Sequence, residues 1–125
     1  MISNRSLIKS FGYAFEGVFY ALKHNQNLRI HFVIGILVIL ASIFFHMSPF
    51  EMGILGITIL VVISAEMINA AIEQMVDLIA TEHRKEAKIA KDVAAGMVLI
   101  TSLGSVIVGI LIFTPHIVRL FISFF

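Results

Sequence analysis

Three apolar stretches cover most of the chain and restrict what it can fold into. They are predicted as helices over residues 31–46, 50–80 and 91–113. A straight helix needs about 20 apolar residues to cross the ~30 Å hydrocarbon core of a bilayer. The first stretch is long enough only if His31 and His46 lie at the two interfaces. The second stretch, about 45 Å long as a helix, exceeds the span, so one of its ends must approach or leave a membrane face.

The composition supports a membrane protein. Of 125 residues 59% are hydrophobic and 14% are charged, and the mean hydropathy is +1.01. A soluble domain of this size could not hide so much apolar surface from water. We therefore predict an all-α integral membrane protein in which residues 1–125 form a single domain. The absence of cysteine from the sequence excludes thiol catalysis and thiolate metal sites.

Residues 4–24 are predicted to form an amphipathic surface helix that precedes the three membrane-spanning helices. Lys9, Glu16 and Lys23 recur every seven residues, opposite a broad apolar and aromatic face. This pattern is typical of a helix that lies in the membrane interface. A helix from a soluble core is the alternative interpretation.

The connections are predicted from their breakers and charges. Pro49 marks a tight turn over 47–51, in which Glu51 is interpreted as a solvated residue. Residues 81–90 are predicted to form a short charged connection, and Pro115 is predicted to end the last helix. The three histidines near the ends of the spans are interpreted as interfacial residues; they are His31, His46 and His116.

Positive charges indicate the orientation. Eight of the nine lysines and arginines lie on the side shared by the N-terminus and the 81–91 connection, and only Arg119 lies on the other. Cytoplasmic loops of membrane proteins carry the excess of lysine and arginine. We therefore expect the N-terminus and this connection to be cytoplasmic, in a multi-pass protein of the cell (inner or plasma) membrane.

One line of polar residues follows the second predicted helix. Its members, at steps of +3, +4 and +4, fall within one arc of about 80° on a helix; they are Glu66, Asn69, Glu73 and Asp77. Carboxylates inside a membrane are costly and usually have a function. Lys91, in the next predicted helix, is expected at the same face of the membrane. Carboxylates, an amide and a lysine together suit the binding of magnesium and phosphate. A small cation or proton transporter would also use acids along a helix, and a non-catalytic assembly subunit is a third alternative.

Two motifs identify a family resemblance. AEMINAAIEQMVDLI contains the pattern E-x-x-N-x-A-x-E-x-x-x-D, and AKIAKDVAAGMVLI contains A-K-D at the start of the last span. These motifs resemble those of the bacterial integral-membrane diacylglycerol kinase and undecaprenol kinase family. The similarity extends over nearly the whole chain, including KSFGYAFEG and the NLRIH segment.

The resemblance implies a homotrimer with active sites shared between subunits, which phosphorylates a membrane lipid alcohol with ATP and Mg²⁺ and binds no nucleic acid. Glu66 would be the catalytic base, and Glu73 would be a magnesium ligand. The resemblance also implies a set of nucleotide-binding residues, which are Tyr13, Asn69, Asp77, Glu82, His83, Lys91 and Asp92.

The sequence departs from the family pattern at two positions. Asn25 stands where a second metal-binding glutamate is usual, so the metal would lose one negative charge but keep an amide oxygen. Ser6, with Arg5 beside it, aligns with an expected arginine. The form of the second motif, and His83 after Glu82, are more similar to the undecaprenol kinases. Undecaprenol is therefore the expected acceptor, and diacylglycerol is the alternative.

Overall fold

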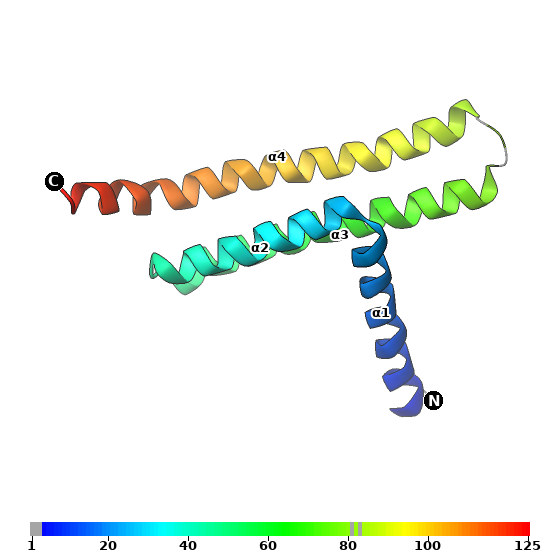
Figure 1. Cartoon of the computed structure of the whole chain (residues 1–125), viewed down its shortest axis with the longest axis horizontal. Coiled ribbons are helices and arrows are strands. Elements are labelled where there is room, and N and C mark those ends of the chain that lie inside the picture. Colours follow the sequence, from blue (N-terminus) through cyan, green and yellow to red (C-terminus); the bar gives the residue numbers. More distant parts are fainter. Residues whose placement is uncertain (1–3, 81, 83) are drawn as a thin grey trace.

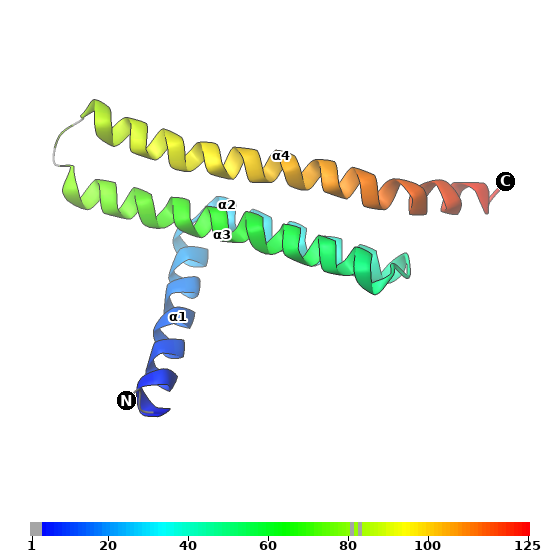
Figure 2. The same cartoon turned by 180° about the vertical axis from the view of Figure 1, so that it is seen from behind.

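The computed structural model describes residues 4–80, 82 and 84–125, and every regular element in this part of the chain is a helix. The helices are α1 (Asn4–His24), α2 (Gln26–Phe44), α3 (Pro49–Ile79) and α4 (Lys85–Ile122). Helices α2, α3 and α4 lie side by side along their length, whereas α1 projects from them at a steep angle (Figures 1 and 2). The prediction of an all-α fold is confirmed for the described residues.

Three helices can cross a membrane. By length and composition α2, α3 and α4 qualify, with 19, 31 and 38 residues. Most large apolar side chains on these helices are exposed in the single chain, for example Leu99 at 60% and Leu103 at 58%. Apolar surface of this extent is stable only against lipid or against other protein. The chain is therefore a multi-pass membrane protein, and the prediction that α1 lies in the membrane interface stays a prediction.

Helix α2 begins at Gln26, five residues before the predicted start of the first span. Asn25, the only residue between α1 and α2, explains this early start. Its side-chain Oδ1 accepts a hydrogen bond from the backbone N–H of Leu28 at 3.2 Å. Asparagine is among the best residues for this N-cap position, because it satisfies a backbone donor that the helix leaves free.

The turn between α2 and α3 is held by hydrogen bonds that the sequence did not predict. Ser48 and Glu51 form a reciprocal capping box, with hydrogen bonds of 3.2 and 2.9 Å, and Pro49 opens the helix. The second carboxylate oxygen of Glu51 lies 2.9 Å from His116 Nε2 on α4. The interpretation of Glu51 as a solvated turn residue is thus wrong. His116, interpreted as interfacial, joins the two helices at this end of the bundle.

The predicted bounds of the last helix are also wrong. Helix α4 starts at Lys85, inside the predicted charged connection, and runs to Ile122 with Pro115 in its interior. Proline removes one backbone donor and usually kinks or ends a helix in water. In a membrane-spanning helix the loss is better tolerated, because breaking the helix would leave more backbone groups unpaired in an apolar medium.

A close approach between α2 and α3 positions the residues discussed below. Gly35 of α2 is buried, and a Cβ atom at this position would lie only 2.9 Å from Cγ2 of Ile59 on α3. Any larger residue would therefore push the two helices apart. His31 lies one turn before Gly35 on the same face of α2, so the tight packing brings His31 against α3.

Candidate functional site

The polar line of α3 runs from a buried end to an exposed end. Glu66 and Asn69 are 1% and 8% exposed, whereas Glu73 and Asp77 are exposed. Only three polar or charged side chains are buried among the described residues, and two of them belong to this line. A buried carboxylate costs free energy unless it is paired or has a function. Glu66 is therefore the starting point for the site.

Glu66 is held by a residue from another helix. Its Oε1 lies 3.3 Å from Nε2 of His31 on α2. Its Oε2 is buried and has no hydrogen-bond partner in the described part of the chain. The interpretation of His31 as an interfacial residue missed this contact with Glu66. The two residues are far apart in the sequence, and no local sequence pattern indicates that they meet. One oxygen of Glu66 is thus occupied, and the other is free to accept a hydrogen bond.

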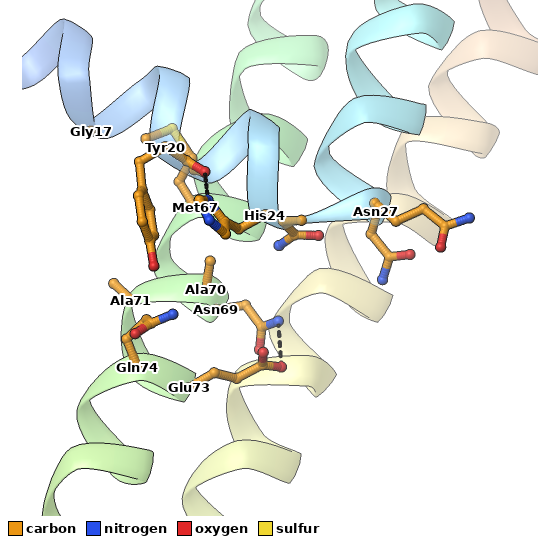
Figure 3. Close-up of a pocket in the computed structure, with 13 residues that line it drawn as sticks. Gly17, Tyr20, His24, Asn27, Met67, Asn69, Ala70, Ala71, Glu73 and Gln74 are labelled. Atoms are coloured by element: carbon orange, nitrogen blue, oxygen red, sulfur yellow. Dashed lines mark hydrogen bonds between the residues drawn. The ribbon is translucent and has the colours of Figure 1, made fainter.

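A pocket of about 480 Å³ lies where α1, α2 and α3 meet (Figure 3). It brings together three of the predicted residues, Asn25, Asn69 and Glu73. Asn69 Nδ2 donates to Glu73 Oε1 at 3.3 Å, while Asn69 Oδ1 is buried without a partner among the described residues. Tyr20 and Gln74 line the pocket as well. The carboxylate and amide oxygens here are the kind of ligand that magnesium prefers.

These oxygen atoms are too few to complete the coordination shell of a metal ion by themselves. The described residues contain no group of three or more His, Cys, Asp or Glu side chains that could hold a metal ion. Magnesium, however, commonly binds only one or two carboxylates and completes its shell with phosphate oxygens and water. The Glu73 carboxylate and the unpartnered oxygen of Asn69 fit this requirement. Asn25 Oδ1 is already used by the cap of α2, which makes it the weaker candidate.

A second polar pocket, of about 620 Å³, lies between the last turns of α3 and the start of α4. It is lined by predicted residues from both helices and the link between them; they are Asp77, Glu82, Lys91 and Asp92. Lys91 Nζ on α4 forms a salt bridge with Asp77 Oδ1 on α3 at 2.5 Å. Lys88 forms a second salt bridge, with Asp92, within α4. Arg84 and Lys85 add two further cations to the lining. The four cations of the lining outnumber its three carboxylates, so the pocket favours an anionic group such as a polyphosphate.

Two predicted nucleotide-binding residues are not placed with the others. Tyr13 is 67% exposed on α1 and lines neither polar pocket. Figure 1 shows why, since the first half of α1 points away from the other three helices. His83 lies outside the described residues. A single chain thus assembles part of the predicted set.

Taken together, fold and site define a class. The chain is a helical multi-pass membrane protein with a buried carboxylate on α3, one polar pocket where α1, α2 and α3 meet, and a second polar pocket at the α3–α4 link. The family model described as prokaryotic diacylglycerol kinase matches residues 12–113. The chain belongs to this family.

Named relatives fall into two groups. A diacylglycerol kinase of Synechocystis is 38% identical over 118 residues, which cover 94% of this chain and 67% of the relative. An undecaprenol kinase of Bacillus subtilis is 36% identical over 107 residues, 86% of this chain and 87% of the relative. A diacylglycerol kinase of Escherichia coli is 26% identical over 110 residues, 88% and 90% of the two chains. Similarity therefore extends to relatives with two different named acceptors.

Proposed function

We propose that this protein is a lipid kinase that transfers the γ-phosphoryl group of ATP to the hydroxyl of a membrane alcohol. The observation that carries the proposal is the burial of Glu66 in a spanning helix whose following turns line pockets suited to magnesium and polyphosphate. Family membership and the kinases among the relatives support it.

Glu66 is proposed as the general base. The alcohol oxygen attacks the γ-phosphorus, the bond from that phosphorus to the bridging oxygen breaks, and ADP leaves with the bridging oxygen. The alcohol proton passes to Glu66. A general base must lie within hydrogen-bond reach of the proton that it removes. The contact from His31 to Oε1 fixes the side chain, so that Oε2 is the oxygen available to take the proton.

The two polar pockets are proposed to bind the magnesium nucleotide. Glu73 and Asn69 would hold Mg²⁺, with Asn25 as a further ligand, and the metal would neutralise charge on the phosphates when bound. Lys91, paired with Asp77, would contact phosphate oxygens. Other parts of the nucleotide site are proposed to come from the remaining predicted residues, which are Tyr13, Glu82, His83 and Asp92.

Undecaprenol is the proposed acceptor, giving undecaprenyl phosphate, and diacylglycerol is the second candidate. The first is supported by the similarity to an undecaprenol kinase and by the sequence AKIAKDVAAG. The second is supported by the relative in Synechocystis. The test is transfer of radiolabelled phosphate from ATP to each lipid in mixed micelles. We expect faster labelling of undecaprenol; labelling of neither lipid would refute the kinase proposal and favour transport.

The location and assembly form part of the proposal. The N-terminus and the α3–α4 link are proposed to face the cytoplasm, in the inner or plasma membrane, because they carry most of the lysines and arginines. A homotrimer with shared active sites is proposed because Tyr13 lies apart from the pockets in one chain. The exposed apolar surface of the three spans leaves room for contacts between subunits.

A further inference from the structure

A third pocket contains two buried polar atoms that lack partners. It has a volume of about 410 Å³ and lies between α2 and α4, with Glu66 of α3 in its lining. Glu66 Oε2 and Ser102 Oγ are both buried and have no hydrogen-bond partner within the described residues. The rest of the lining comes from the start of α2 and one face of α4, namely Asn27, Ile30, His31, Ala95, Val98 and Leu99.

Ser102 differs from the neighbouring hydroxyl residues of the same helix. Thr101 and Ser105 donate to carbonyls one turn earlier in α4, at 3.0 and 2.7 Å. Serine and threonine in membrane helices commonly satisfy their hydroxyls in this way. Ser102 makes no such bond. An unpaired hydroxyl away from water costs free energy, so a group that binds there would regain it.

The two free atoms define the chemistry of the ligand. Glu66 Oε2 accepts a hydrogen bond, and a carboxylate at this position repels anions such as phosphate. Ser102 Oγ carries a proton that it can donate. A ligand that satisfies both atoms donates one hydrogen bond and accepts another. An alcohol hydroxyl does this, and the apolar lining around it suits the first carbons of a lipid chain.

We propose that Ser102 is a positioning residue for the lipid acceptor. The alcohol hydroxyl donates to Glu66 Oε2 and accepts from Ser102 Oγ, which turns a lone pair of the alcohol oxygen away from the base and toward the phosphoryl group. The pocket between α2 and α4 holds the adjoining part of the lipid. This assignment rests on the proposed lipid kinase activity and adds to it the place where the acceptor binds.

The test compares Ser102→Ala with Ser105→Ala in the labelling assay, with undecaprenol and ATP varied separately. One hydrogen bond of ordinary strength is worth roughly a 3- to 10-fold change in binding. We expect Ser102→Ala to raise the KM for the lipid by this factor and to leave the KM for ATP unchanged. Ser105→Ala removes the same atom from a hydroxyl bonded within its own helix, so its two KM values should stay at the original level.

Nucleotide titration by calorimetry gives a second measurement that does not depend on turnover. Ser102→Ala should bind magnesium-ATP as the unaltered protein does, which also shows that the variant is folded. An unchanged KM for the lipid would overturn the assignment, as would an equal loss of lipid and nucleotide binding. If the unaltered protein labels no lipid alcohol, the kinase proposal itself fails, and that result is separate from any difference between the variants.

Discussion

Replacing Glu66 by glutamine is the most direct test of the proposed mechanism. The carboxylate is 1% exposed, and its Oε1 lies 3.3 Å from His31 Nε2. Glutamine has nearly the same shape and keeps an oxygen that can accept the bond from His31, but it cannot take a proton. The substitution therefore removes the base and leaves the packing of α2 against α3 in place.

The size of the expected loss in kcat follows from the rate enhancement that a general base provides. A general base contributes about 10²- to 10⁴-fold to a rate. This range corresponds to roughly 3–5 kcal/mol in the activation free energy, at 1.36 kcal/mol for each factor of ten. Glu66→Gln should lower kcat for lipid phosphorylation by this factor. Magnesium-ATP binding should be retained, because Glu66 lines neither pocket proposed for the nucleotide.

The assay measures turnover and nucleotide affinity on the same preparation. Labelling of undecaprenol gives kcat, calorimetric titration gives the Kd for magnesium-ATP, and thermal unfolding gives the Tm as a control for the fold. Glutamine keeps the shape of the side chain and its contact with His31, so the Tm should change little. Near-normal turnover in Glu66→Gln, or loss of nucleotide binding with it, would refute the assignment of Glu66 as the base.

Three further predictions address the metal site and the orientation. Glu73→Gln should weaken magnesium-nucleotide binding about fivefold or more, since one unit charge at 4 Å is worth about 1 kcal/mol even in water; unchanged calorimetric affinity would exclude Glu73 as a ligand. Asn25→Asp keeps a good N-cap for α2 and adds a charge, so it should lower the magnesium concentration for half-maximal activity; no change would mean that Asn25 does not contact the metal. The chain has no cysteine of its own, so a single introduced cysteine reports the side of the membrane on which it lies. Glu86→Cys should react with an impermeant thiol reagent only from the cytoplasmic side, and Phe50→Cys only from outside. The reverse pattern would place the site on the membrane face opposite to ATP.

The sequence alone was sufficient for features that depend on neighbouring residues along one helix. Periodicity and apolar length predicted four helices and three spans, and the structure has them. The polar line on α3 was predictable for the same reason, because residues three and four apart share a face of any helix. The family could be recognised from two short motifs, since both are contiguous in the chain. The roles assigned to those residues stay predictions.

Other features depended on how the helices pack against one another. His31 and Ser102 come next to Glu66 only because α2 and α4 lie against α3 at a particular register, which Gly35 helps to set. No local pattern in the sequence encodes that register. The contact between Glu51 and His116 likewise joins residues that are far apart in the chain.

The course of α4 through Pro115 is the clearest case of tertiary and solvent context overriding a local signal. Proline predicts the end of a helix because it lacks a backbone N–H and its ring clashes with the carbonyl four residues earlier. In a spanning helix this loss is better tolerated, because continuing the helix leaves fewer backbone groups unpaired than breaking it. The residues by themselves determined that helices form and which face of each is polar. Only the packed structure decided where α4 ends and which side chains from different helices meet at Glu66.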